Sequence, residues 1–322
     1  MRGTLRILVF IALVFVFLFT LVFLQPAPTG FSSNIQWGVT FSKPLAIDMG
    51  LNWQETYLAI LDDLKVKYLR LPVYWEDVEP QKNNYNFNDY DWMIKEAEKR
   101  KVKLILVVGY KLPRWPECHE PNWAKSEVSS LKTQDLLKYI KTVVNRYKEN
   151  PALYAWQVEN EPFLDFGECP KFDVEFLDKE IELTRSLDTT HPIILTDSGE
   201  LGFWLRAAKR GDIFGTTMYR VVWNKYLGYI RYDLLLPYQF FWLKANLIHL
   251  FYPQKPIIVS ELQAEPWRGE GMDLKQFSKN IEFAKKVGFP EAYLWGVEWW
   301  YWLKVKQNDP SFWNEAKKLF EK

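Results

Sequence analysis

The chain has 322 residues, of which 48% are hydrophobic and 25% are charged, as in an ordinary globular protein rather than a disordered one. Lys and Arg number 41 against 40 Asp and Glu, a net charge of +1, which offers no basic footprint for nucleic acid. Two cysteines and three histidines argue against a disulfide-built miniprotein and against a multi-histidine metal site. Aromatic residues reach 17%, with 16 Trp, whose flat rings suit sugar faces and interfaces.

An apolar segment opens the chain. Residues 7–24 carry no charge over 18 positions, which is long enough for a helix to span a bilayer core. Arg2 and Arg6 precede this segment and the next charged residue is Lys43, so the positive-inside rule predicts a cytoplasmic N-terminus and an extracytoplasmic remainder. A cleaved signal peptide is the alternative, and it would release a secreted protein. Its apolar region is usually shorter and ends in an A-x-A-like site, which is not evident here.

Three segments follow from this interpretation. We expect a transmembrane signal-anchor over residues 1–24, a short Pro-containing linker over residues 25–33, and one catalytic domain over residues 34–322. In that oxidising compartment, Cys118 and Cys169 each lie in a Pro-containing loop just beyond an apolar run. We therefore expect a disulfide between adjacent loops, with two free thiols as the alternative.

Short apolar runs alternate with helical patterns through the rest of the chain. The strand-like runs are 35–41, 67–75, 103–110, 154–160, 192–197, 213–219, 255–261 and 291–296. The helical patterns are 52–65, 88–101, 131–149, 173–187, 200–210, 236–251, 273–287 and 310–321. Continuous apolar runs are typical of strands buried on both faces, and eight such units predict an α/β fold of the (β/α)8 TIM-barrel type, preceded by the transmembrane helix. An open doubly wound sheet would normally carry a Gly-rich turn after its first strand, and residues 38–44 are not one.

Catalytic groups of such a barrel lie at the carboxyl ends of its strands. The fourth predicted strand ends at Glu161 and the seventh at Glu261, on strands that face each other across the barrel. Glycoside hydrolysis needs such a pair, one carboxylic acid to protonate the leaving oxygen and one carboxylate to attack or to activate water. The alternative for either Glu alone is a structural ion pair with Arg or Lys.

These motifs resemble those of a known clan. Asn160-Glu161-Pro162 after the fourth strand, with Glu261 ending the seventh, resembles the retaining β-glycosidases with (β/α)8 barrels, clan A, which includes cellulase-like and β-galactosidase-like families. Residues 68–72 (YLRLP) look like the second strand of that clan. Residues 75–80 and 85–87 match the turn that follows it in several families.

The resemblance implies a role for each matching residue. Glu161 would be the acid/base and Glu261 the nucleophile, so that hydrolysis passes through a glycosyl-enzyme intermediate. The substrate-binding residues would include Asn160 at the sugar 2-hydroxyl, Arg70 and Tyr219 at the nucleophile's carboxylate, and Trp295 as the floor under the cleaved sugar. A carboxylate pair at the spacing of retaining enzymes cannot comfortably ionise twice, so Glu161 should keep its proton while Arg70 favours an ionised Glu261.

Two residues depart from the clan's pattern. Thr217 stands where many members have His, two residues before Tyr219. Glu159 stands where members often have an apolar residue. By strand alternation Glu159 and Gln157 would face the same way as Glu161. Glu159 could be a buried ion-pair partner, with Arg70 as the candidate, or an extra polar contact. We expect the ion pair, because an unpaired buried carboxylate is costly.

Other polar and aromatic residues lie near the predicted mouth. His119 could bind substrate in a subsite or be structural, Glu298 could bind a hydroxyl or be a loop acid, and Trp267 could touch substrate. Several further tryptophans are candidates either for stacking on sugar rings or for packing within loops: Trp115, Trp123, Trp223, Trp299, Trp300 and Trp302. The apolar segment 226–252 could lie against the membrane, and its alternative is a loop capping the cleft followed by a barrel helix.

The sequence therefore predicts a retaining glycoside hydrolase that acts on a β-linked carbohydrate, needs no cofactor, metal or nucleic acid, and contacts the membrane through residues 7–24. A catalytically idle sugar-binding barrel and a transglycosylase of cell-envelope glycan are the alternatives. A barrel enzyme acting on carbonyl or phosphate substrates is a further one. It would usually need a Lys base or a late Gly-rich phosphate loop, and neither is apparent.

Overall fold

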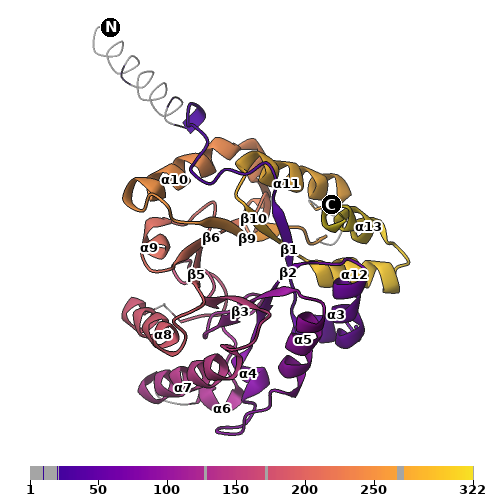
Figure 1. Ribbon diagram of the computed structural model, residues 1–322. Coiled ribbons are helices and arrows are strands. Elements are labelled where there is room, and N and C mark those ends of the chain that lie inside the picture. The colour runs from indigo at the N-terminus through magenta and orange to yellow at the C-terminus, as the bar shows by residue number, and fades with distance from the viewer. Residues whose placement is uncertain are drawn as a thin grey trace.

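A closed barrel of parallel strands forms the centre of the computed structural model, which describes residues 10, 20, 22–126, 129–170, 173–266 and 272–321 (Figure 1). The barrel strands are β1 (Gln36–Thr40), β2 (Tyr68–Pro72), β3 (Lys103–Val108), β4 (Leu153–Val158), β5 (Ile193–Asp197), β6 (Ile213–Met218), β9 (Ile257–Gln263) and β10 (Glu291–Trp295). They follow one another around the barrel in chain order, and β10 pairs with β1 to close it. The predicted (β/α)8 barrel is therefore confirmed.

Helices surround this barrel (Figure 1). They are α2 (Lys43–Asp48), α3 (Trp53–Asp62), α4 (Trp75–Val78), α5 (Asn88–Lys99), α6 (Asn122–Lys125), α7 (Ser129–Tyr147), α8 (Val174–Leu187), α9 (Leu205–Ala208), α10 (Tyr238–Phe251), α11 (Leu274–Val287), α12 (Val297–Lys306) and α13 (Ser311–Phe320). Side-chain caps begin several of them. Asn52 and Asp173 each accept hydrogen bonds from two backbone N–H groups in the first turn of α3 and α8, respectively.

The core has two layers, which explains the continuous apolar runs. Side chains such as Ile105, Ile194 and Ile258 fill the inside of the barrel, whereas their neighbours along each strand pack outward against the helices. Because both faces of each strand are buried, no polar alternation is possible along it. This arrangement leaves the strand ends as the place where polar side chains gather.

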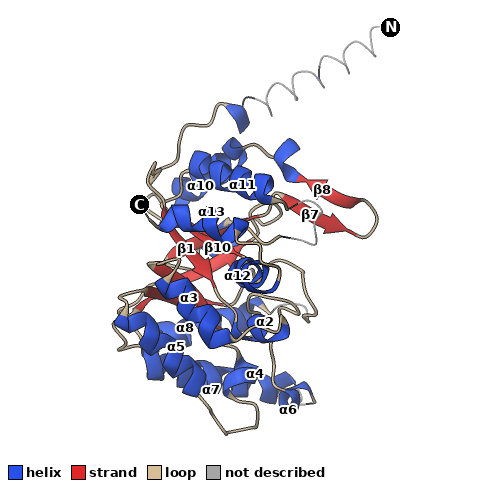
Figure 2. Ribbon diagram, turned by 90° about the vertical axis from the view of Figure 1, so that its right-hand side faces the viewer, coloured by secondary structure: helices blue, strands red, loops and turns tan. Residues whose placement is uncertain are grey.

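Three local predictions need correction. Residues expected to form a loop after the sixth strand make an antiparallel hairpin of β7 (Val221–Asn224) and β8 (Gly228–Arg231), which projects from the barrel in Figure 2. The predicted helix over residues 200–210 is reduced to the four residues of α9. The tryptophans after the eighth strand belong to the helix α12, and Trp300 is buried against Phe277 rather than open to the mouth.

The N-terminal linker lies along the outside of the barrel, beside α10 and α11 (Figure 1). Asn246 of α10 donates hydrogen bonds to Gln25 Oε1 and to the Pro26 carbonyl, both at 3.1 Å. The Phe31 ring meets the Trp242 ring edge-on at 5.9 Å between centroids. Most of the predicted membrane segment, residues 7–24, falls outside the described residues. Within the described part of the chain, no helix has the length and apolar character needed to cross a bilayer.

Candidate active site

Arg70 organises the carboxyl end of the barrel. It is fully buried at the third position of β2, and its guanidinium reaches three side chains from two other strands or the loops that follow them. Nη1 donates to Glu261 Oε1, Nη2 to Asn160 Oδ1 and Nε to Gln157 Oε1, each at 2.8 Å. The structure thus brings together three of the residues predicted from the sequence. A buried guanidinium with this many acceptors fixes their orientations.

Glu261 has two strong donors. Besides Arg70 on Oε1, the Tyr219 hydroxyl donates to Oε2 at 3.0 Å. Burial, followed by the charge of Glu261, raises the pKa of Tyr219 well above its usual range, so this hydroxyl keeps its proton and remains a donor. These hydrogen bonds, one to each oxygen, hold the carboxyl group in one orientation. Such a group is suited to nucleophilic attack.

Glu161 has a different environment. Its backbone N–H donates to Thr196 Oγ1 at 2.8 Å, and the Thr217 hydroxyl donates to its Oε1 at 3.1 Å. Burial is the largest cause that raises the pKa of Glu161 well above its usual range, and the nearby Glu261 charge is the next. Thr217, at the position where the clan often has His, therefore contacts this carboxyl group directly. Glu161 is suited to hold a proton at neutral pH.

The prediction for Glu159 is wrong. Glu159 is not paired with Arg70; its carboxylate accepts the backbone N–H groups of Tyr110 at 2.6 Å and Lys111 at 2.5 Å. The physical reason is backbone geometry, because β4 ends at residue 158 and Glu159 has φ of 59°, which breaks the strand alternation. Gly109 permits this approach, since a Cβ there would lie 2.3 Å from Glu159 Oε1.

Trp295 and Glu298 meet at Arg114. The guanidinium of Arg114 lies over the Trp295 ring, 3.6 Å from its centroid, and Trp295 is buried. Arg114 also donates to Glu298 Oε2 at 2.6 Å and to Glu265 Oε2 at 2.9 Å. Glu298 is fully buried and accepts the Ser42 N–H through its other oxygen. Trp295 and Glu298, which were both predicted to bind substrate, thus contact other protein side chains. Arg114 covers one face of the Trp295 ring.

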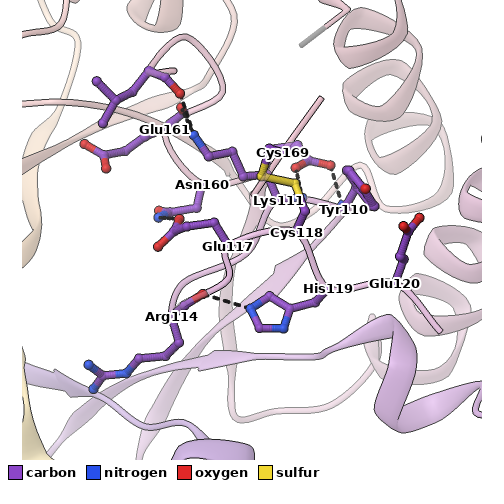
Figure 3. Close-up of a disulfide and its surroundings, with 12 residues drawn as sticks. Tyr110, Lys111, Arg114, Glu117, Cys118, His119, Glu120, Asn160, Glu161 and Cys169 are labelled. Atoms are coloured by element: carbon purple, nitrogen blue, oxygen red, sulfur yellow. Dashed lines mark hydrogen bonds between the residues drawn. A yellow bond between two sulfur atoms is a disulfide. The ribbon is translucent and has the colours of Figure 1, made fainter. Parts of the chain in front are cut away.

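The disulfide between Cys118 and Cys169, predicted from the sequence, is confirmed (Figure 3). It joins the loop after β3 to the loop after β4. His119 follows Cys118, and Figure 3 shows its ring directed at the carbonyl oxygen of Arg114. Its Nδ1 lies 3.0 Å from Glu76 Oε1 and its Nε2 lies 2.9 Å from the Arg114 carbonyl oxygen, which favours the structural alternative.

The remaining candidates divide by exposure. Trp115 and Trp223 are 64% and 61% exposed, so their rings are open to a ligand. Trp123 is partly buried and donates to the Glu79 carbonyl, which indicates loop packing. Trp267 lies outside the described residues. Among the residues that the structure describes, no group of three or more His, Cys, Asp or Glu is arranged to hold a metal ion.

Sequence reasoning missed Glu117 and Arg114. Both lie in the loop after β3, and Figure 3 shows their side chains on the same side of this loop as Glu161. Burial, and then the charge of Glu261, raise the pKa of Glu117 to about 8. The available signal was position, because acidic and basic residues directly beyond a barrel strand lie at the catalytic end.

One stretch of the chain, less than half of its length, matches the model of a known family. Residues 72–175 match the profile described as glycosyl hydrolase family 10, a stretch that includes Glu161 and ends before Glu261. Over 133 residues the chain is 29% identical to a probable mannan endo-1,4-beta-mannosidase A-1 from Aspergillus terreus. The aligned part covers 38% of this chain and 32% of that relative, so the chain spans about a third of the length of the curated relatives it matches.

Similarity to solved structures extends over most of the barrel. Xylanase 10B from Thermotoga maritima has a TM-score of 0.61 at 16% identity, covering 90% of this chain and 97% of the xylanase. This likeness confirms the barrel fold, and together with the matching family profile it bears out the resemblance to (β/α)8-barrel glycoside hydrolases. The endo-beta-1,4-mannanase from Thermotoga petrophila has a TM-score of 0.56 at 17% identity, covering 82% of this chain and 68% of the mannanase. At these identities the structural likeness establishes the fold alone.

Proposed function

We propose that the chain is a retaining β-glycoside hydrolase, with Glu261 as nucleophile and Glu161 as acid/base. The observation that carries this proposal is the contrast between the two carboxyl groups. Glu261 accepts hydrogen bonds from Arg70 and Tyr219, whereas burial and the Glu261 charge raise the pKa of Glu161. One ionised carboxylate and one protonated carboxyl group in the same site are what this reaction requires.

The reaction has two displacement steps. Glu261 attacks the anomeric carbon while Glu161 protonates the glycosidic oxygen, so that the carbon–oxygen bond breaks, the aglycone leaves and a glycosyl ester forms on Glu261. The ester no longer carries the charge that raised the pKa of Glu161. Glu161 then accepts a proton from water, which attacks the anomeric carbon and frees Glu261. The sugar is released with the configuration it had in the substrate.

We further propose a β-1,4-linked polysaccharide substrate, with mannan first and xylan second. The support is in the names of similar proteins, which include a probable mannan endo-1,4-beta-mannosidase, an endo-beta-1,4-mannanase and a xylanase. A panel of β-linked polysaccharides and nitrophenyl β-glycosides, with proton NMR of the newly formed sugar, tests both parts. We expect release of the β-anomer first. Release of the α-anomer, or no cleavage of any β-glycoside, would contradict the proposed function.

We also propose that residues 1–24 are an uncleaved membrane anchor. The domain over residues 34–322 would then be held close to the extracytoplasmic face of that membrane. The support is the uncharged run of 18 residues and the exposed apolar side chains near the linker, with Leu250 and Phe251 of α10 at 74% and 59% exposure. Carbonate extraction of membranes from cells expressing the full chain tests this. Full-length protein in the pellet is expected, and a shortened protein in the medium would overturn it.

A further inference from the structure

Glu117 is a third carboxyl group at the candidate active site, and neither displacement step uses it. It is only 7% exposed, and Figure 3 shows its carboxyl group on the same side as the Asn160 amide and the Glu161 carboxyl group. Glu120, three residues farther along the same loop, points the other way in that view. A carboxyl group buried at this position costs free energy unless it has a partner, so it needs an explanation.

The surrounding loop holds Glu117 in one place. Its N–H donates to the Arg114 carbonyl and its carbonyl accepts the Leu112 N–H, both at 2.7 Å. The next residue, Cys118, is tied by the disulfide to the loop after β4. From that second loop Gly167 packs so closely that a Cβ there would lie 2.6 Å from Glu117 Cβ. The side chain is therefore prepositioned rather than free to reorient.

Asn160 beside it has a fixed donor and acceptor. Arg70 Nη2 donates to Asn160 Oδ1 at 2.8 Å and Gln157 Nε2 donates to the same oxygen at 3.3 Å, so Oδ1 must be the acceptor and Nδ2 the donor. Nδ2 faces Glu117 Oε2 at 3.5 Å, which is long for a hydrogen bond. Of the described side chains, Asn160 alone donates a hydrogen bond to the Glu117 carboxyl group.

We propose that Glu117 adds a second contact to the 2-hydroxyl of the sugar whose bond is cleaved, beside the contact already expected from Asn160, and that this pair selects sugars with a hydroxyl at carbon 2. A hydroxyl accepts from Asn160 Nδ2 and donates to Glu117 at once. An ammonium at carbon 2 only donates, so Asn160 would face it with a second donor. An acetamido group would place its bulkier acetyl group against the same two side chains, where a hydroxyl places a single oxygen. This inference rests on the proposed function and narrows its substrate class.

The charge state of Glu117 fits this role. Because burial raises its pKa to about 8, it is mainly neutral at pH 7 and adds no second full charge beside Glu261. A neutral carboxyl group still accepts a hydrogen bond from the sugar through its carbonyl oxygen. Contacts at the 2-hydroxyl strengthen in the transition state of retaining enzymes. Removing the Glu117 carboxyl group should therefore lower kcat more than it raises KM.

The test compares a nitrophenyl β-glycoside with its 2-deoxy analogue in the full chain, the Glu117→Ala variant and the Glu117→Gln variant. We expect Glu117→Ala to lower kcat/KM by roughly 10- to 100-fold on the 2-hydroxy substrate and by less than about twofold on the 2-deoxy substrate. Gln keeps a carbonyl acceptor, so Glu117→Gln should recover much of the loss. Glu120→Ala, on the same loop, is the matched control and should leave both rates unchanged.

The two substrates are compared within each variant, so a difference in folding yield cancels. An equal loss on both substrates in Glu117→Ala and Glu117→Gln would overturn the assignment of Glu117 while leaving the proposed function intact. Wild-type protein that cleaves no β-glycoside with a 2-hydroxyl would instead overturn the proposed function, and this inference with it. Wild-type protein that prefers a 2-amino or 2-acetamido glycoside would contradict the selectivity alone.

Discussion

Two pairs of buried carboxyl groups lie near the end of β4 and differ in what surrounds them. Glu161 shares the barrel mouth with Glu261, whereas Glu159, two residues earlier, faces Glu180 of α8 outside the barrel. Burial is the largest cause of a raised pKa in three of these four groups, with the pKa of Glu159 raised to about 7 and that of Glu180 well above its usual range. Raised pKa values therefore do not separate the pairs.

Hydrogen-bond partners separate the pairs. Glu159 is held by the backbone N–H groups of Tyr110 and Lys111, so it links strand β3 to the end of β4. Glu261 is held by side chains, Arg70 and Tyr219, which leave the carboxylate aimed at the barrel mouth. A perturbed carboxyl group is a catalytic candidate only when it also faces a cleft with an organised partner. The comparison predicts loss of chemistry at one pair and a change of stability at the other.

The largest expected effect is at the mouth. Glu261→Ala and Glu161→Ala should each lower kcat by about 10⁴-fold or more, because each removes a group that acts on the reacting bond. Azide should restore turnover in part, giving an α-glycosyl azide from the first variant and a β-glycosyl azide from the second. Glu180→Gln is the control and should keep kcat within about threefold. Near wild-type kcat in either alanine variant would contradict the roles.

The acid role of Glu161 sets the pH dependence. Since the pKa of Glu161 is raised and the protonated form is needed, kcat/KM should fall as pH rises through that pKa. Glu161→Ala, assayed with a dinitrophenyl glycoside whose leaving group needs no proton, should lose this alkaline limb. A pH profile of kcat/KM between pH 4 and 10 measures it. The same alkaline limb in wild type and variant would show that another group titrates there.

The disulfide supports the mouth and has no counterpart at the Glu159 pair. Replacing Cys118 and Cys169 by Ser should cost about 2–4 kcal/mol of unfolding free energy and lower kcat/KM, because the loop that carries Glu117 loses a tether. The chain has 2 cysteines, so a reductant should reproduce the effect in wild type and leave the double variant unchanged. Thermal unfolding and kinetics in parallel check this. Unchanged stability after reduction would contradict it.

The smallest expected effect is at Glu180. Its folded pKa is raised, so the folded state prefers the protonated form, and stability is lost as pH rises from the unfolded pKa through the folded one. Glu180→Gln cannot ionise and should lose less stability over this range. We expect the difference between Tm at pH 5 and Tm at pH 9 to shrink by a few degrees. If the Tm difference between pH 5 and pH 9 is unchanged or larger in Glu180→Gln, ionisation of Glu180 does not cause the loss of stability at high pH.

The sequence predicted the barrel because burial on both strand faces leaves an unambiguous pattern. All eight predicted barrel strands have a counterpart, and Glu261 lies within β9, as expected for the seventh strand. The β7–β8 hairpin was missed because its residues mix aromatic and polar side chains without strict alternation. The tryptophans of α12 were assigned to the mouth because no composition signal distinguishes a buried Trp from an exposed one.

Site residues, too, were predicted only where a sequence pattern marks them. Arg70, Asn160 and Tyr219 could be identified because a motif marks them, and all three enter one hydrogen-bond network that includes Glu261. Glu159 was misjudged because its positive φ, which no local pattern reveals, turns its side chain away. The position of Glu117 depends on a disulfide between two loops that are distant in sequence, and only the folded chain brings it beside Asn160.

The most direct test of the central claim is mass spectrometry of the trapped intermediate. A dinitrophenyl 2-deoxy-2-fluoro-β-glycoside slows the second displacement, so the glycosyl ester should accumulate on the enzyme. We predict one added glycosyl unit per chain, located on Glu261 in the digested peptide, and none in the Glu261→Ala variant. A label on any other residue, or turnover without any label, would contradict the account.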